Sequence, residues 1–199
     1  MLHLLAFIAI WYGLKSALEC ILQEYKNSSK IAGNITSIIN GSLMILSPII
    51  MLGFEEIFNC GVLALEILIQ LNAAYNAVDF VNASITYKIH HVGVFICDYL
   101  ILTQQSFQIQ LWLMITYSMV ELSNIFVWSY YHKIQAYNFK PSTYDIKIQL
   151  AWFASFRGLA LCLAAIGWLK FNILTEFITF LIVSIGAVYW SYGMYKKCF

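Results

Sequence analysis

The chain has 199 residues, of which 61% are hydrophobic and only 11% are charged, and its formal net charge is +1. Soluble globular domains carry about 25% charged residues, so this composition excludes an ordinary soluble domain and predicts an integral membrane protein. The small net charge gives no indication of nucleic-acid binding. The five cysteines lack paired spacing, which argues against a disulfide framework or a zinc site, and no metal site is predicted.

Long apolar runs recur along the whole chain, and each is close to the roughly 20 residues that cross a bilayer as a helix. We therefore predict an all-α, polytopic transmembrane helical bundle with seven spans. The first run lacks a basic n-region, which favours a retained helix over a cleaved signal peptide. The longest predicted connection, at 132–147, is interpreted as an interfacial loop. The predicted spans are 3–22, 33–53, 57–81, 91–110, 111–131, 149–169 and 172–194.

Lysines gather in alternate connections of this topology, with eight on one side and only Lys170 in a loop on the other. The positive-inside rule then predicts a luminal N-terminus and a cytosolic C-terminus. The final Lys196-Lys197 pair is similar to the dilysine retrieval signal of resident endoplasmic-reticulum proteins, with an ordinary interfacial lysine pair as the alternative. The remaining lysines on the predicted cytosolic side are Lys26, Lys30, Lys88, Lys133, Lys140 and Lys147.

Several charged residues fall inside predicted spans, and five of them belong to the third to sixth spans. A charge at the centre of a membrane helix costs about 2.5–3.5 kcal/mol on insertion scales, so such residues normally face a bundle interior or a wet cavity. We expect the same here, although not every one of them needs to take part in chemistry. The five are Glu66, Asp79, Asp98, Glu121 and Arg157.

The fourth predicted span begins with a pair of histidines. His91, Asp98 and Gln105 are seven residues apart and form one helical stripe, whereas His90 points about 100° away. Asp79 ends the preceding span, so it should meet both histidines at the same cytosolic depth. A carboxylate that orients an imidazole makes a general base or a nucleophile. The alternative is a pair of interfacial histidines solvated by lipid headgroups.

Polar stripes also mark the neighbouring spans. Asn72, Asn76 and Asp79 share one face of the third span, and Glu121, Asn124 and Trp128 share one face of the fifth. Arg157, the chain's only arginine, is the natural counter-ion for Glu121 or Asp98. The asparagines and Gln105 also fit simple interhelical hydrogen bonding, worth about 0.6 kcal/mol per bond in membranes.

Five motifs occur in the order and spacing of the TLC domain. They are AAYNAVDF, IHHVGVF, MVELSNIFVW, WFASFRGLAL and AVYWSYGMYKK. The chain therefore resembles this family, which includes ceramide synthases and translocon-associated membrane proteins. The resemblance divides the chain into an N-terminal transmembrane helix at 1–26 and a TLC domain at 27–199. It implies six helices around a cavity open towards the cytosolic side.

The resemblance also implies site residues. It makes His90 and His91 an acyl-handling pair and Asp79 a supporting carboxylate, with acyl-CoA as co-substrate and no bound cofactor. The cavity would be lined by Asn76, Asp98, Glu121, Asn124 and Arg157. One departure is clear, because ceramide synthases carry a histidine-aspartate-x-x-aspartate cluster where this chain has LWLMITYSMVELSNIF with a single Glu121. That brings the chain nearer to the small TLC-domain proteins.

Two functional hypotheses follow. The first is a histidine-dependent lipid acyltransferase distantly similar to ceramide synthase, in which Arg157 or a lysine binds phosphate. The second is a non-enzymatic protein for lipid sensing, membrane composition or cargo trafficking that uses the same cavity. A proton-coupled transporter ranks last, because matching broken helices in two halves are not evident. We expect membrane lipids as partners, an endoplasmic-reticulum location and no nucleic acid, and we leave a homo-oligomer open.

Overall fold

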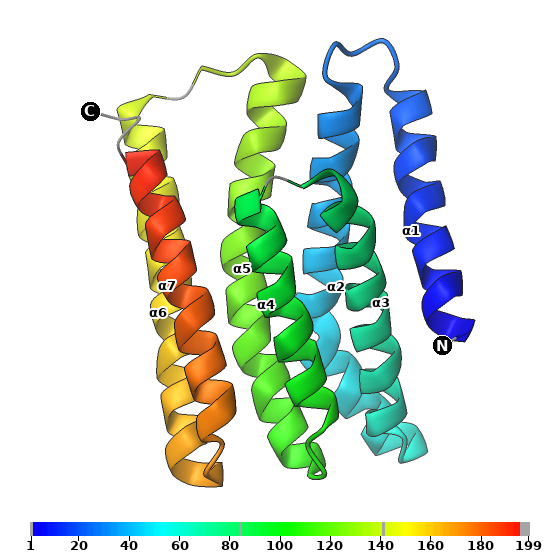
Figure 1. The fold of residues 1–199 in the computed structure, drawn as a ribbon, viewed down its shortest axis with the longest axis vertical. Helices are drawn as coiled ribbons and strands as arrows, with labels where there is room; N and C mark the ends of the chain where they lie inside the picture. Colours follow the sequence, from blue (N-terminus) through cyan, green and yellow to red (C-terminus); the bar gives the residue numbers. More distant parts are fainter. Residues whose placement is uncertain (1, 84, 141, 196–199) are drawn as a thin grey trace.

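The computed structural model describes residues 2–83, 85–140 and 142–195, with side chains except at 2, 82, 86, 87 and 187–195. The described residues form seven α-helices and no strand, which confirms the predicted all-α bundle (Figure 1). Five of them, α1, α2, α3, α5 and α6, are long and apolar enough to cross a membrane. The chain is thus a multi-pass integral membrane protein. The helices are α1 (Leu2–Ile21), α2 (Ser28–Phe58), α3 (Gly61–Asn82), α4 (Ile85–Leu102), α5 (Phe107–Tyr137), α6 (Thr143–Phe171) and α7 (Leu174–Tyr195).

Six of the helices form a two-layer bundle, and α1 packs on its edge. One layer contains α3, α4 and α7, and the other contains α2, α5 and α6 (Figure 1). Helix α5 packs against α2, α4 and α6, whereas α1 packs against α2 and α3. This arrangement places the inward faces of α2, α3, α4 and α5 around a common interior.

Three helices are each followed by an asparagine in the left-handed backbone conformation. Asn59, Asn138 and Asn172 follow α2, α5 and α6, with φ angles of 53°, 50° and 58°. Asparagine is one of the few residues other than glycine that adopts this left-handed conformation readily, and it terminates helices in the way a C-terminal glycine does. These local signals set where the long apolar helices stop.

The interfacial loop predicted at 132–147 is much shorter in the structure, because α5 continues to Tyr137 and α6 begins at Thr143. Ser142 and Asp145 form a capping box at this start. The Ser142 hydroxyl accepts from the Asp145 backbone N–H (3.2 Å), and the Asp145 carboxylate accepts from the Ser142 backbone N–H (2.9 Å). The reciprocal pair satisfies two N–H groups that an uncapped helix would leave free.

The end predicted for the fourth span, 91–110, was wrong. Helix α4 ends at Leu102 and α5 begins at Phe107, so the intervening Thr-Gln-Gln-Ser is a connection. Its first two side chains donate to the carbonyl of Leu100 at 3.0 and 3.3 Å. Such side-chain donors compensate the carbonyls that a helix leaves unpaired at its C-terminus. Gln105 therefore does not share a helical stripe with His91.

Pro48 lies inside α2 and links this helix to α5. A proline inside a helix removes the N–H that would bind the carbonyl four residues earlier, which here belongs to Met44. The hydroxyls of Ser47 and Ser118 lie 2.6 and 3.0 Å from that carbonyl oxygen. The Ser47 hydroxyl thus satisfies this carbonyl within α2, and Ser118 of α5, which also lies 2.7 Å from the Met114 carbonyl, brings α5 against it.

Apolar side chains cover the outside of the bundle as well as fill its core. Asparagine, serine, threonine and charged side chains lie buried among the core residues. Many large apolar side chains lie on the outside, a pattern that fits contact with lipid. Examples of these exposed side chains are Leu5, Ile10, Ile49, Leu63, Ile89, Val92, Leu169 and Ile182.

Three connections meet at one end of the bundle: α1 to α2, α3 to α4 and α5 to α6 (Figure 1). We call it the lysine-rich end, because Lys26, Lys30, Lys88, Lys133, Lys140 and Lys147 lie in or beside these connections. Lys170 is at the opposite end, in the last turn of α6. These lysines lie at one end because successive helices run in opposite directions. The side of the membrane that each end faces stays a prediction. Lys196 and Lys197 lie outside the described residues.

The close approach of α5 and α6 gives a stability prediction. A Cβ at Gly167 would lie 2.6 Å from Nε1 of Trp112, whose indole donates to the Leu163 carbonyl at 2.9 Å. We expect Gly167→Ala to displace this indole and to lower the free energy of unfolding in detergent by about 1–3 kcal/mol. The matched control is Gly158→Ala on the same helix, where nothing lies within 4 Å. Equal effects of the two substitutions would contradict this packing.

Candidate functional site

A buried network of polar side chains runs through five helices of the bundle. Helix α3 contributes all of its predicted stripe, whereas α4 contributes His91 and Asp98 and α5 contributes Glu121 and Asn124. The members of each stripe recur at three, four or seven residues and therefore share one face of their helix. Helices α2 and α6 complete the network. Its members are Ser37, Asn40, Asn72, Tyr75, Asn76, Asp79, His91, Asp98, Tyr117, Glu121, Ser123, Asn124 and Arg157.

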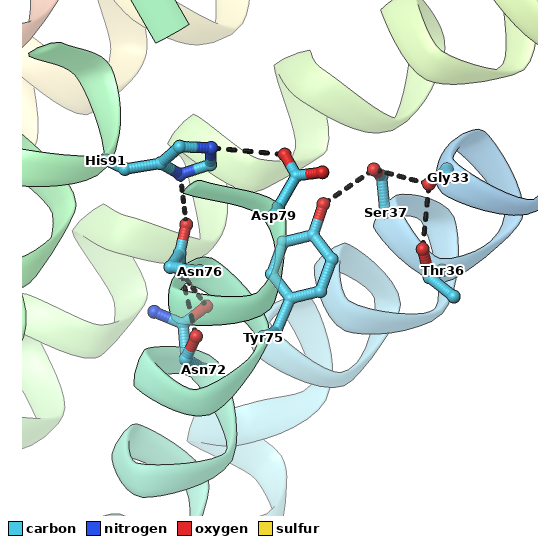
Figure 2. A network of polar contacts seen from close by, with 8 residues as sticks. All are labelled: Gly33, Thr36, Ser37, Asn72, Tyr75, Asn76, Asp79 and His91. Atoms are coloured by element: carbon cyan, nitrogen blue, oxygen red, sulfur yellow. Dashed lines mark hydrogen bonds and ion pairs between the residues drawn. The ribbon is translucent and has the colours of Figure 1, made fainter. Parts of the chain in front are cut away.

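His91 is held at both ring nitrogens (Figure 2). Nδ1 lies 2.7 Å from Oδ1 of Asn76, and Nε2 lies 3.1 Å from Oδ2 of Asp79. His91 is buried, whereas 27% of the Asp79 side chain is exposed. Asp79 and His91 form an ion pair when the imidazole is protonated. The predicted meeting of the carboxylate with the histidine pair is confirmed for His91.

Asn72 is the central residue of the network. Its Nδ2 lies 3.0 Å from each carboxylate oxygen of Asp98 and 3.1 Å from the Tyr117 hydroxyl, and its Oδ1 accepts from Nδ2 of Asn40 at 2.9 Å. An ionised carboxylate only accepts hydrogen bonds. Oδ1 of Asn72 also accepts from Nδ2 of Asn76 at 3.2 Å, which leaves Nδ2 of Asn72 facing Asp98. Asn72 in turn sets the orientation of the Asn40 amide.

The orientation of the Asn76 amide determines which nitrogen of His91 carries a proton. Nδ2 of Asn76 donates to the Asn72 backbone carbonyl at 2.8 Å, which leaves Oδ1 of Asn76 facing the imidazole. His91 must then donate from Nδ1. The remaining contact, from Nε2 to Asp79, requires one proton shared between the imidazole and the carboxylate. His91 thus has no free ring nitrogen to offer a substrate.

His90 is different, because none of the described residues forms a hydrogen bond with its ring. The ring is partly buried, and its centroid lies 5.6 Å from that of His91. It borders an internal cavity of about 20 Å³, enough for about one water molecule. The cavity is lined by Ser37, Asn40, Asn72, Tyr75, Asn76, His90, His91, Val94, Glu121, Asn124 and Trp128.

A second, smaller cavity lies between α1, α2 and α3. Its volume is about 10 Å³, and Lys15 of α1 and Asp79 of α3 both line it. Tyr75 borders both cavities, and its hydroxyl lies 2.6 Å from Oγ of Ser37 (Figure 2). Trp11 fixes α1 at this place by donating from its indole to the Leu71 carbonyl at 2.9 Å. Asp79 therefore lies between the histidine pair and the edge helix.

Arg157 attracts Glu121 electrostatically, as expected of a counter-ion, but it forms no direct ion pair with Glu121 or Asp98. Its Nε donates to Ser123 at 3.0 Å and its Nη2 donates to Oδ1 of Asn124 at 2.8 Å. Asn124 then donates to Glu121 at 3.3 Å. An amide is thus inserted between the two charges, since Ser123 and Asn124 lie nearer to α6 on the surface of α5. Asp98 and Arg157 belong to the network but do not line the cavity.

Other sequence predictions fall into two groups. Asn72, Asn76 and Asn124 form interhelical hydrogen bonds as expected. Glu66 is exposed on α3, so the expectation that it faces the interior was wrong. On a helix surface that contacts lipid, a long carboxylate side chain can reach towards the interface.

The sequence reasoning missed the contribution of α2. Ser37 and Asn40 line the cavity, and Tyr117 of α5 joins Asn72. A signal was present, because Asn34, Ser37 and Asn40 recur every three residues and share one face of an otherwise apolar run. All three are buried.

Comparisons with protein-family models, curated proteins and solved structures find no match to this chain. Within the described part of the chain, no group of three or more histidine, cysteine, aspartate or glutamate residues is arranged to hold a metal ion. The site is therefore interpreted from its own geometry.

Asn72 and Asp98 should be strongly coupled. Asn72→Ala leaves the buried Asp98 carboxyl without its hydrogen-bond partner, so we expect the free energy of unfolding to fall by about 1–3 kcal/mol. The double substitution with Asp98→Ala should cost about 1–3 kcal/mol less than the sum of the two single effects. Gln108→Ala, at an exposed position of α5, is the control and should change stability by less than about 0.5 kcal/mol. Purely additive effects would show that the two side chains do not interact.

Proposed function

We propose that this chain is a TLC-domain type of membrane protein that transfers an acyl group from acyl-CoA to a membrane lipid. The observation that carries the proposal is the arrangement of the two histidines. His91 is fixed by Asn76 and Asp79, while His90 faces the cavity without a hydrogen-bond partner among the described residues. One oriented and one free imidazole, side by side, suit proton transfer.

His90 is the general base in this proposal. It removes a proton from the hydroxyl or amine of the acceptor lipid while that atom attacks the thioester carbonyl of acyl-CoA. The carbon–sulfur bond then breaks, and the CoA thiolate takes the proton from His90, so the imidazole returns to its neutral form. The His91–Asp79 pair positions His90 and stabilises its transient positive charge. Proton transfer of this type contributes about 10²–10⁴-fold to rates.

The surroundings of the histidines support a charged, water-soluble co-substrate. They lie within two turns of the connection from α3 to α4, at the lysine-rich end. Lysines attract phosphate groups, and Lys88, whose Nζ lies 5.4 Å from the ring centroid of Phe80, is the lysine nearest to His90 in the sequence. We propose that this end faces the cytosol, where acyl-CoA is found, and that the protein resides in the endoplasmic reticulum.

A second candidate function is lipid binding without turnover, in sensing or trafficking. It is favoured by the single Glu121 where ceramide synthases carry a histidine-aspartate-x-x-aspartate cluster. The cavity of about 20 Å³ accommodates about one water molecule rather than an acyl chain. Catalysis therefore requires helices to separate near His90 when the lipid enters. A lipid sensor would use the same separation as its signal.

The two functions are separated by acyl transfer assays in lipid nanodiscs. Purified protein is incubated with acyl-CoA and mixed acceptor lipids, and acylated lipid is measured by mass spectrometry. We expect His90→Ala to lower the rate by at least about 10²-fold, and His91→Asn to lower it less because its effect is indirect. His3→Ala, at an exposed position of α1, is the control and should retain full activity.

Two results of these assays would contradict acyl transfer by His90. If the unmodified protein forms no acylated lipid but still co-purifies with lipid, the second function is supported. Equal rates in the His90→Ala variant and the unmodified protein would remove the histidine from the mechanism.

A further inference from the structure

Lys15 of α1 carries a charge within a membrane span and has no partner in the described part of the chain. Its side chain is partly buried, and it forms no hydrogen bond, ion pair or ring contact with residues 2–83, 85–140 and 142–195. A charge in a membrane span is costly unless it is paired or reaches a polar group. The ammonium of Lys15 therefore needs an acceptor that the described residues do not supply.

Asp79 of α3 faces Lys15 across the second cavity, because both side chains line it. They form no ion pair with each other, so the cavity separates the two charges. Oδ2 of Asp79 contacts Nε2 of His91, whereas Oδ1 forms no hydrogen bond with the described residues, and the side chain is 27% exposed. One unpaired ammonium and one available carboxylate oxygen thus border the same cavity.

The two side chains lie near the lysine-rich end of the bundle. Helix α1 ends at Ile21 and α3 ends at Asn82. At a rise of about 1.5 Å per residue, Lys15 and Asp79 lie about 9 and 4.5 Å from these ends. A lysine at this depth extends its apolar stem towards the lipid phosphates. A phospholipid headgroup is thus within reach of both side chains.

We propose that the second cavity binds the headgroup of a phospholipid that carries ethanolamine. The lipid phosphate accepts from Nζ of Lys15, and the primary ammonium of the lipid donates to Oδ1 of Asp79. The two opposite charges of this headgroup match the two opposite charges that border the cavity without touching. The bound lipid ties α1 to α3, and the site does not rest on the proposed acyl transfer.

The size of the cavity favours ethanolamine over other headgroups. Its volume of about 10 Å³ admits a group of about the size of one water molecule. A primary ammonium has this size and offers three N–H donors, whereas the trimethylammonium of choline is larger and offers none. A serine headgroup would place a second carboxylate beside Asp79. Glycerol headgroups lack the positive charge.

The test counts the lipids that the purified full chain retains in detergent, by native mass spectrometry. Phosphatidylethanolamine, phosphatidylcholine and phosphatidylglycerol are compared at one concentration. We expect the ethanolamine lipid to be retained at least about tenfold better than the others, since each of them lacks a charge-assisted hydrogen bond. Lys15→Met removes the charge but keeps a long stem, and it should lower this retention about tenfold. Asp79→Asn should abolish the preference for ethanolamine over glycerol.

Lys26→Met is the matched control, because Lys26 is exposed in the connection from α1 to α2 at the same end. It should leave retention unchanged. Free phosphoethanolamine, the soluble source of the same groups, should not raise the unfolding temperature, whereas the lipid should raise it.

Three results would overturn the proposal. The first is equal retention of the three lipids, and the second is unchanged retention in Lys15→Met. The third is a fall in the unfolding temperature of Lys15→Met that is the same with and without the ethanolamine lipid, because Lys15 would then pair with Asp79 directly. If Asp79→Asn does not fold, Lys15→Met decides alone.

Discussion

Charged and amide side chains inside a membrane bundle must satisfy one another, because lipid offers them no hydrogen bonds. In this protein the central residue of these contacts is Asn72 of α3. It contacts Asn40 of α2, Asp98 of α4 and Tyr117 of α5. One amide thus joins four helices. Its orientation is linked to that of Asn40 on one side and, through the Asn76 amide 3.2 Å from its Oδ1, to His91 on the other.

The network separates the roles of two adjacent histidines. Consecutive residues on a helix point about 100° apart, so only His91 reaches the stripe of α3 that carries Asn76 and Asp79. His90 is left at the cavity with its ring nitrogens unbonded by the described residues. A rigid neighbour of this kind preorganises a reactive group better than a mobile loop does. The fold therefore supplies positioning from buried polar contacts, while an occupant would have to enter by local separation of helices.

The helical bundle was predictable because apolar runs of membrane length dominate the sequence. The stripe of Asn72, Asn76 and Asp79 was also predictable, because spacing along a helix determines which residues share a face. The partners of each stripe were not, because they depend on how neighbouring helices are rotated and how far they slide. Arg157 illustrates the limit. Charge alone pointed to Glu121, but the register between α5 and α6 places Asn124 between them.

The hydrogen bonds of the amide network predict which ring nitrogen of His91 carries a proton. Solid-state ¹⁵N NMR of the protein in bilayers, with selectively labelled histidine and His91→Asn for assignment, reports the protonation of each ring nitrogen. The contacts of Asn76 and Asp79 predict that Nδ1 of His91 carries a proton, with Nε2 in a shared-proton contact with the carboxylate. An unprotonated Nδ1 on His91 would contradict the orientation of Asn76, and with it the chain of amides that leads to Asp98 and Asn40.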